Sequence, residues 1–300
     1  VPEKLFCPKS VAYAYHTYKG KCIHDESFGL ACGKKHSHQR EIVSCYGDPM
    51  KPLLRKCAKA IRMIRKINGE FSWTLWNQSQ LSGEFMLRYN KLKKLEEHQC
   101  SCAVCGVKKP ATVLAKFDAA QFFKGASMHR GIARMIGLMK RVEHRRKIRA
   151  IAMPHGKQTG GYFCSRFKRN NSQVQVVPFS LIKQVLAALK EDVYCVVGDQ
   201  VLKRRHGWPM GGSFSEPATM VDLNESIRQV FRSHKKRVEV GWHIPGLSLP
   251  EILMGVLHVD DSIIVSHLLC LQCISNGIQK VFPADTGMEL EESGEVLRFL

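Results

Sequence analysis

Three acidic residues stand where short apolar segments end, and they are the first candidates for chemistry. Asp118 directly follows the segment TVLAKF, and Asp260 and Asp261 lie between two apolar segments within residues 252–265. Two carboxylates a few ångströms apart repel each other and resist desolvation, so an acidic pair between buried strands calls for a cation. The pair alone would also fit a turn used only for its geometry. Asp118, at a comparable strand end, favours a cation site.

A glycine-rich turn lies between these acids in the sequence. It reads GWPMGGSFS over residues 207–215. Pro209 and Gly211 let the chain turn sharply, and a glycine permits a close approach that a side chain would block. Ser215 also suits the N-cap of a following helix, and the two interpretations are compatible.

Hydrophobic periodicity predicts the elements that must position these motifs. Residues 1–47 have no clean period, and we expect them to be irregular. Helices are predicted at 52–68, 81–98, 121–139, 179–191 and 215–233, a hairpin at 193–197 and 200–203, and strands at 112–117, 252–259 and 263–265.

The charge of the chain indicates a polyanionic partner. Forty-six Lys and Arg against twenty-six Asp and Glu give a net charge of +20, far beyond what solubility requires. Nucleic acid is the first candidate. We expect one basic run to contact the nucleic-acid backbone, and the alternative is that this run is only a solvated face. The run consists of Lys140, Arg141, Arg145, Arg146, Lys147 and Arg149.

No membrane span is expected. The most apolar stretch, residues 252–274, is interrupted by Asp260 and Asp261, and two acids at mid-bilayer depth would be very costly. The chain has no secretory signal pattern, and its twelve cysteines are too sparse for a disulfide scaffold. We therefore expect reduced thiols and an intracellular location, nuclear or cytoplasmic.

One cysteine pair raises the question of zinc. Cys102 and Cys105 have the spacing of a zinc knuckle. Other ligands could complete the tetrahedron: His98, Cys22, Cys32 or His36. One such pair without a well-spaced second pair is more often a turn with ordinary buried thiols. We therefore expect no Zn²⁺ at Cys100, Cys102 and Cys105.

In chain order, these motifs resemble the palm of reverse transcriptases. FDAAQFF at 117–123 is similar to motif A, GWPMGGSFS at 207–215 to motif B, and VDDS at 259–262 to motif C. Further on, GMEL at 287–290 looks like the fourth motif and VLRFL at 296–300 like the start of the primer grip. Each motif alone is weak, but their ordered conjunction is specific. The Pro-Met-Gly turn is most similar to those of retroelement, Penelope-like and telomerase-type enzymes.

The resemblance covers roughly residues 112–300 and implies an α+β fold. It would be a right-hand polymerase palm and fingers, an antiparallel sheet with packed helices, with the thumb missing. Residues 1–110 would form a helical, Cys/His-bearing region, either fingers or an extension. Residues 111–300 would form the fingers and palm domain, truncated at the primer grip.

The resemblance also implies roles for individual residues. Asp118 and Asp260 would be catalytic and would bind two Mg²⁺, or Mn²⁺, with the backbone of Ala119, while Asp261 would be the flanking catalytic acid. Substrate contacts would come from Ala120, Gln121, Phe122, Phe123, Pro209, Met210 and Gly211. The primer grip would include Leu297, Phe299 and Leu300.

The implied activity is RNA-directed DNA synthesis, in which dNTPs are added to a primer on an RNA or DNA template. Phe123 would lie beneath the ribose and favour deoxynucleotides. One departure concerns the fourth motif, where the family usually has a Lys and this chain has Glu291, Glu292 and Ser293. The alternatives are an RNA-dependent RNA polymerase and a decayed palm that only binds nucleic acid. The sequence indicates no oligomeric state.

Overall fold

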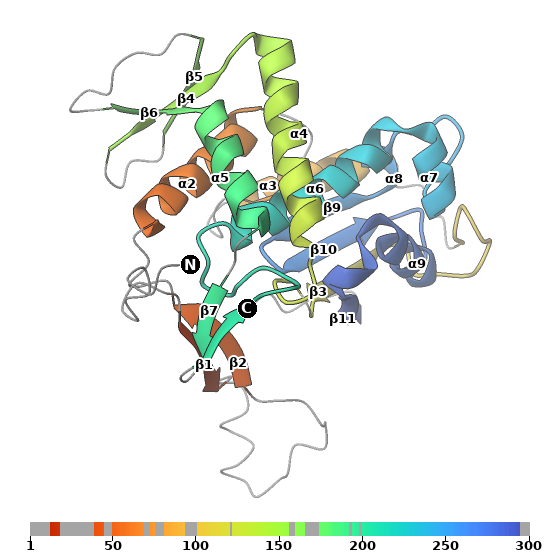
Figure 1. Cartoon of the computed structure of the whole chain (residues 1–300). Coiled ribbons are helices and arrows are strands. Elements are labelled where there is room, and N and C mark those ends of the chain that lie inside the picture. The colour runs from red at the N-terminus through yellow and green to blue at the C-terminus, as the bar shows by residue number, and fades with distance from the viewer. Residues whose placement is uncertain are drawn as a thin grey trace, which may run out of the picture. The chain divides into compact units, whose positions relative to one another are not determined.

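The chain folds into two compact units in the computed structural model (Figure 1). The first comprises Val1–Ile67 with Ile136–Pro217, and the second Asn68–Met135 with Ala218–Leu300. The predicted domain boundary at residue 110 stays a prediction. The structure describes residues 13–18, 39–44, 50–68, 73–75, 81–93, 101–120, 122–155, 160–165, 174–191, 194–197 and 200–294.

The described part of the first unit contains two small sheets and several helical segments. One sheet has the order β2-β1-β7-β8, in which β1 and β7 are parallel, and the other has the antiparallel order β5-β4-β6. Helix α4 (Met128–Arg146) begins in the second unit and ends here. The other elements are β1 (Tyr13–Tyr18), β2 (Gln39–Ser44), α2 (Lys51–Asn68), β4 (Ala150–Pro154), β5 (Tyr162–Cys164), β6 (Val174–Pro178), α5 (Phe179–Glu191), β7 (Tyr194–Val197) and β8 (Gln200–Lys203).

The prediction that residues 1–47 are irregular was wrong for two segments. β1 and β2 pair along their whole length, from Tyr13 opposite Ser44 to Tyr18 opposite Gln39. β1 also pairs with β7, about 180 residues further along the chain. Such long-range pairing depends on tertiary context, which local periodicity does not contain.

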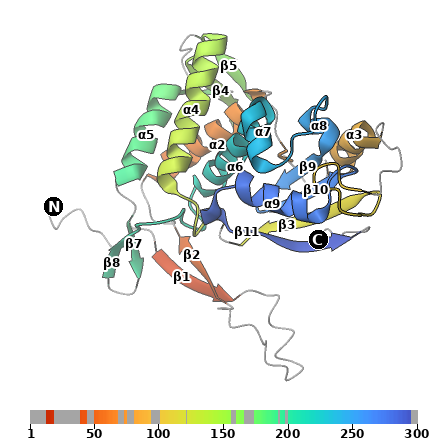
Figure 2. The ribbon, with the colours of Figure 1, turned by 90° about the vertical axis from the view of Figure 1, so that its right-hand side faces the viewer.

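The second unit is built on one antiparallel sheet with the order β11-β3-β10-β9. Helix α9 packs on β3 and β11, and α3 lies beside β9 and α8 (Figure 2). Its elements are α3 (Leu81–Lys93), β3 (Val113–Ala119), α6 (Ser215–Arg232), α7 (His234–Val240), α8 (Leu249–Ile252), β9 (Met254–His258), β10 (Asp261–Ser266), α9 (Leu271–Val281), the 3-10 turn η5 (Ala284–Thr286) and β11 (Met288–Gly294).

The core of the second unit is apolar and contains two tryptophans. Trp73 and Trp242 are buried with their ring centroids 6.4 Å apart, and they share one cluster with Phe117, Leu257 and Ile264. β3 and β10 are therefore held by burial as well as by hydrogen bonds. In the part of the chain that the structure describes, no helix is both long and apolar enough to cross a membrane.

Candidate active site

The predicted acids meet at one end of the central strand pair. Asp118, near the end of β3, lies directly opposite Asp261, the first residue of β10. Asp260 stands just before β10, in the two-residue turn that follows β9. The backbone N–H of Ala119 donates to the carbonyl oxygen of Asp260 at 3.1 Å. Antiparallel pairing thus brings Asp118 close to two adjacent acids that lie about 140 residues further along the sequence.

The turn that carries Asp260 has a strained backbone. Val259 has a φ of 55°, in the left-handed region that β-branched residues rarely adopt. His258 and Asp261 close the turn as paired residues of β9 and β10. A conformation of this kind persists only where the surrounding structure enforces it, and such residues cluster at functional sites.

A buried lysine lies among the acids. Lys116 is two residues before Asp118 in β3 and is only 7% exposed. Its Nζ is 2.8 Å from a carboxylate oxygen of Glu291 and 3.7 Å from one of Asp261. Glu291 comes from β11, so three strands contribute to this group of charges. Sequence reasoning missed Lys116 and the pairing of Glu291, although strand alternation places residues 116 and 118 on one face.

Lys116 does not fully compensate the negative charge of the neighbouring carboxylates. Burial raises the pKa of Asp118, and the neighbouring Asp260 and Asp261 raise it further. Burial also raises the pKa of Asp261, which Lys116 lowers and Asp260 raises. Half-buried carboxylates of this kind are the hard oxygen ligands that Mg²⁺ and Mn²⁺ prefer, so the residues fit a divalent cation.

A second ionic network supports the edge of this sheet. Arg130 makes two-pronged contacts with Asp222 and with Asp285, with the shortest distances at 2.8 and 2.6 Å. Arg134 also pairs with the buried Asp222, at 2.8 Å. Asp285 lies in η5, directly before β11, and the N–H of Ala120 donates to the carbonyl oxygen of Gly287 at 3.0 Å. The network therefore ties helices α4 and α6 to the start of β11.

Ala120, which follows β3, and residues 122–125 form turns rather than the start of a helix. Ala120 is exposed, and the N–H of Phe122 donates to the carbonyl oxygen of Ala119 at 2.9 Å. Phe122 is 4% exposed and belongs to the core, whereas Phe123 is half-buried and meets it edge to face at 4.6 Å. Phe123 is thus the more accessible of the two rings. Gln121 lies outside the described residues.

The glycine-rich turn lies in the first unit and leads into α6 as predicted. The N–H of Gly212 donates to the carbonyl oxygen of Pro209 at 2.8 Å, and Ser215 Oγ donates to the same oxygen at 2.5 Å. Gly211 is exposed with a φ of 94°, which favours glycine at this position. Pro209 and Met210 are half-buried.

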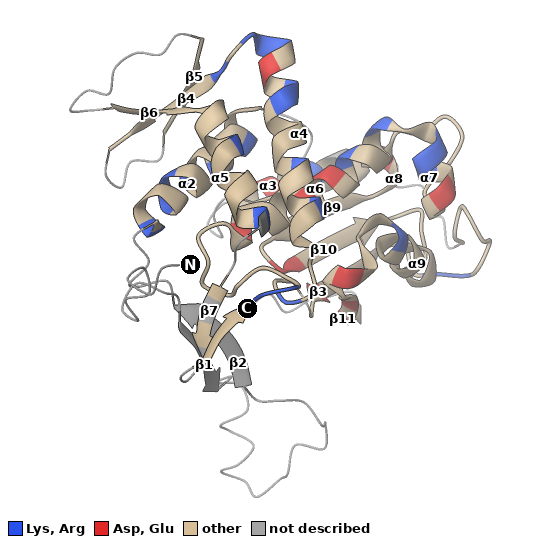
Figure 3. Cartoon of the chain, viewed as in Figure 1, with Lys and Arg blue, Asp and Glu red and all other residues tan. Residues whose placement is uncertain are grey.

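Most of the basic run is exposed, at the end of α4 and in the residues that follow. Arg141 is half-buried, and Lys140, Arg145, Arg146, Lys147 and Arg149 are exposed. Basic residues recur along this end of α4 (Figure 3). Their accessibility is compatible with phosphate contact and with a solvated face alike. The predicted primer-grip residues Leu297, Phe299 and Leu300 lie outside the described residues.

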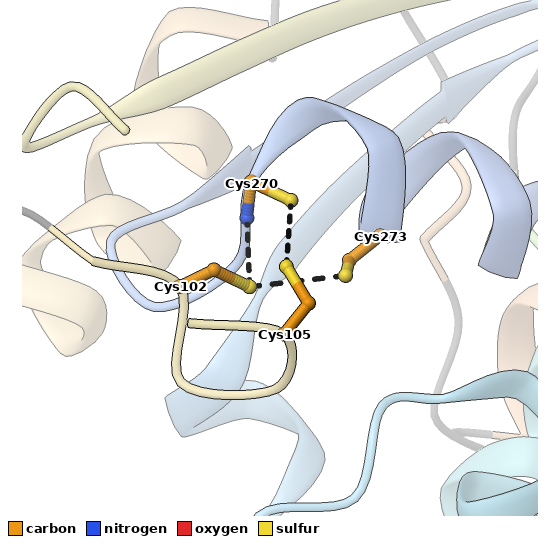
Figure 4. A group of neighbouring side chains, drawn as sticks. All are labelled: Cys102, Cys105, Cys270 and Cys273. Carbon is orange, nitrogen blue, oxygen red and sulfur yellow. Dashed lines mark hydrogen bonds between the residues drawn. The ribbon is translucent and has the colours of Figure 1, made fainter. Parts of the chain in front are cut away.

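The cysteines differ from the expectation of isolated thiols. Cys102 and Cys105 lie beside Cys270 and Cys273, with all four Sγ atoms within 4.8 Å of one another (Figure 4). The signal that sequence reasoning missed is the second Cys-x-x-Cys pair, at 270 and 273. Cys100 and the other suggested ligands, His98, Cys22, Cys32 and His36, lie outside the described residues.

The sheet, its covering helices and the acidic turn define a polymerase palm and fingers, and a solved structure shares this fold. Telomerase from Candida tropicalis, in complex with a fragment of telomeric RNA, aligns with a TM-score of 0.53 and 14% identity over 86% of this chain and 39% of that one. The apo form of the same telomerase aligns with a TM-score of 0.48 over 83% of this chain and 36% of that one, at 14% identity.

An RdRp complex aligns with a TM-score of 0.47 and 12% identity, over 92% of this chain and 21% of that one. The chain thus spans less than half the length of these solved structures. No protein-family model matches the chain, and no curated protein matches it. At these identities, the comparison with the telomerase complex shows the fold alone.

Proposed function

We propose that this chain is the catalytic part of an RNA-directed DNA polymerase. The observation that carries the proposal is the cross-strand pairing of Asp118 with Asp261, with Asp260 in the adjoining turn. A protein that only binds nucleic acid gains nothing from acids that face a polyanion. The palm fold, which the telomerase complex shares, and the net charge of +20 support the proposal.

Asp118 and Asp260 would hold two Mg²⁺ ions, with Asp261 adjusting the charge beside them. When bound, the ions supply activation of the primer 3′-hydroxyl and stabilisation of the leaving pyrophosphate. The chain contributes orientation: the β3–β10 pairing sets the spacing of the carboxylates. Burial raises the pKa of Asp261, and Lys116 opposes part of this rise by neutralising some of the repulsion between the carboxylates.

Phe123 would select the sugar of the incoming nucleotide. Its half-buried ring follows Asp118 by five residues, on the turn between β3 and α4. An aromatic ring beneath the ribose leaves no room for a 2′-hydroxyl and offers it no hydrogen-bond acceptor. A ribonucleotide would then suffer both a clash and an unsatisfied polar group, and dNTPs would be preferred.

The experiment that tests this proposal compares templates and nucleotides. The natural protein is given a primed RNA or a primed DNA template, with Mg²⁺ and either dNTPs or NTPs. We expect dNTP-dependent extension on the RNA template. Preferential use of NTPs would instead assign an RNA-dependent RNA polymerase, and template binding without extension in any combination would assign a decayed palm.

A further inference from the structure

Two Cys-x-x-Cys pairs from distant parts of the sequence converge at the start of α9 (Figure 4). Cys102 and Cys105 precede β3, and Cys270 and Cys273 lie 165 to 171 residues further along. We propose that the four cysteines form a structural Zn²⁺ site within the second unit. The proposal does not depend on the polymerase activity.

Two of the distances between the sulfur atoms match tetrahedral thiolate coordination, and all four atoms lie within 4.8 Å of one another. Cys102 Sγ is 3.8 Å from Cys273 Sγ, and Cys105 Sγ is 3.6 Å from Cys270 Sγ. A tetrahedron with Zn–S bonds of about 2.3 Å has S···S edges of about 3.8 Å. A disulfide would bring two of these atoms to about 2.05 Å. A four-iron cluster would hold the cysteine sulfurs outside a cube of iron and sulfide, and therefore farther apart.

The first pair lies on a tight turn that directs both sulfurs to one side. The N–H of Gly106 donates to the carbonyl oxygen of Cys102 at 2.9 Å, and the N–H of Cys102 donates to that of Val107 at 2.8 Å. Gly106 has a φ of 72°, which a residue with a side chain would adopt only with strain. A Cys-x-x-Cys-Gly turn of this shape brings two thiolates to one ion.

The second pair lies at the N-terminus of α9. Cys270 is the N-cap residue, yet its side chain makes no capping hydrogen bond and is directed toward the other cysteines (Figure 4). Cys273 follows in the first turn of the helix. The partial positive charge of a helix N-terminus stabilises thiolates, which are the form that binds zinc.

Backbone donors also favour a thiolate at Cys102. The N–H of Cys270 lies 3.4 Å from Cys102 Sγ. Zinc binds the deprotonated thiolate, and a backbone N–H directed at the sulfur atom stabilises that form.

Zinc at this point would hold β3 and β10 in register. The N–H of Ala103 donates to the carbonyl oxygen of Leu268 at 2.9 Å, beside the end of the strand pair where Val113 lies opposite Ser266. Asp118 and Asp261 lie at the other end of the same pair. A slip of one residue would turn alternate side chains to the wrong face and separate the acids. Four thiolates leave no open coordination position, so the ion would be structural.

Metal analysis of the purified chain tests the proposal directly. The protein is prepared under reducing conditions without chelator, and its zinc is measured by mass spectrometry together with that of Cys105→Ser and Cys164→Ser. Cys105 is exposed, so serine there changes little packing, and Cys164 lies on β5 in the other unit as the matched control. We expect one zinc per chain in the wild type and in Cys164→Ser, and almost none in Cys105→Ser.

Replacement of the zinc by Co²⁺ gives a second readout that requires no variant. The wild-type protein should then show the intense visible absorption of tetrahedral Co²⁺–thiolate coordination. Three results would overturn the proposal: a zinc content far below one per chain, iron in its place, or disulfides among the four cysteines under reducing conditions. A full zinc load in Cys105→Ser would overturn the assignment of the ligands.

Discussion

Gly255 in β9 leaves the space that the indole of Trp73 occupies. A Cβ added at Gly255 would lie 2.1 Å from Cδ2 of Trp73 and 2.3 Å from its Cε3. Carbon atoms in contact are about 3.5 to 4.0 Å apart, so either the ring or the strand must move by more than about 1 Å. Trp73 is only 2% exposed, and its carbonyl oxygen accepts from the N–H of Leu257 at 2.8 Å.

The substitution Gly255→Ala should therefore destabilise the second unit and displace the acidic turn. Overpacking of this kind costs about 1 to 3 kcal/mol, or a fall in Tm of roughly 2 to 10 °C. β9 leads into the turn that carries Asp260, so metal-dependent extension should also fall at temperatures well below the melting transition. Thermal denaturation and primer extension measure the two effects.

Two further variants separate the clash from a general effect of alanine. A Cβ at Gly83 in α3 meets nothing within 4 Å, so Gly83→Ala should stabilise the chain by about 0.5 to 1 kcal/mol. The double variant Trp73→Leu/Gly255→Ala should lose less stability than the sum of the losses in the two single variants, because the smaller side chain removes the clash. Wild-type stability in Gly255→Ala, or strict additivity in the double variant, would refute the reasoning.

Three other predictions concern the sugar, the nucleic-acid backbone and the acids. Phe123→Ala should raise the kcat/KM for rNTPs relative to dNTPs by roughly 5- to 150-fold, the equivalent of about 1 to 3 kcal/mol, and equal discrimination in both proteins would remove Phe123 as the gate. Replacing Arg145, Arg146 and Lys147 by Glu should reduce the slope of log K against log salt by about 0.9 per lost phosphate contact. Replacing the exposed Lys235 and Lys236 by Glu is the control. An unchanged slope in the first variant would mean that the run is a solvated face. Burial raises the pKa of Asp118 in the folded chain above its unfolded value of about 4. The fold therefore favours the protonated side chain, so the contribution of Asp118 to stability is present below about pH 4 and is lost as the pH rises through the folded pKa. Metal-free Asp118→Asn should thus melt above the wild type at neutral pH, with the gap closing below about pH 4; a constant gap would contradict the raised pKa.

The elements with strong local signals were predictable from the sequence. The predicted helix 179–191 coincides with α5, and the hairpin strands agree with β7 and β8 to within one residue. Helix α4 begins at Met128, although we expected its start at Gln121. Ser127 caps it, with Oγ accepting from the N–H of Arg130 at 3.3 Å. This N-cap signal was present in the sequence and outweighs the apolar residues before it.

The features that escaped prediction depend on contacts between distant segments. The thiol cluster forms because the fold brings Cys102 close to Cys270. Cys270 lies in the apolar stretch 252–274, which we interpreted only by its hydropathy. The pairing of Lys116 with Glu291 follows from the register of β11 on β3, which contains an irregularity between Leu290 and Glu292. The three acids could be named as candidates from the sequence because an acid that ends an apolar strand is costly to bury whatever its partner.

Primer extension by acid-to-amide variants tests the central claim most directly. The natural protein, Asp118→Asn and Asp260→Asn are compared on a primed RNA template with Mg²⁺ and dNTPs, and Glu239→Gln, on the exposed part of α7, is the matched control. We predict that both aspartate variants lose extension while they bind the template at least as tightly as the wild type, because an amide removes repulsion from phosphate. The control should extend like the wild type. Extension at the wild-type rate by either aspartate variant, or no Mg²⁺-dependent extension by the wild type, would contradict the account.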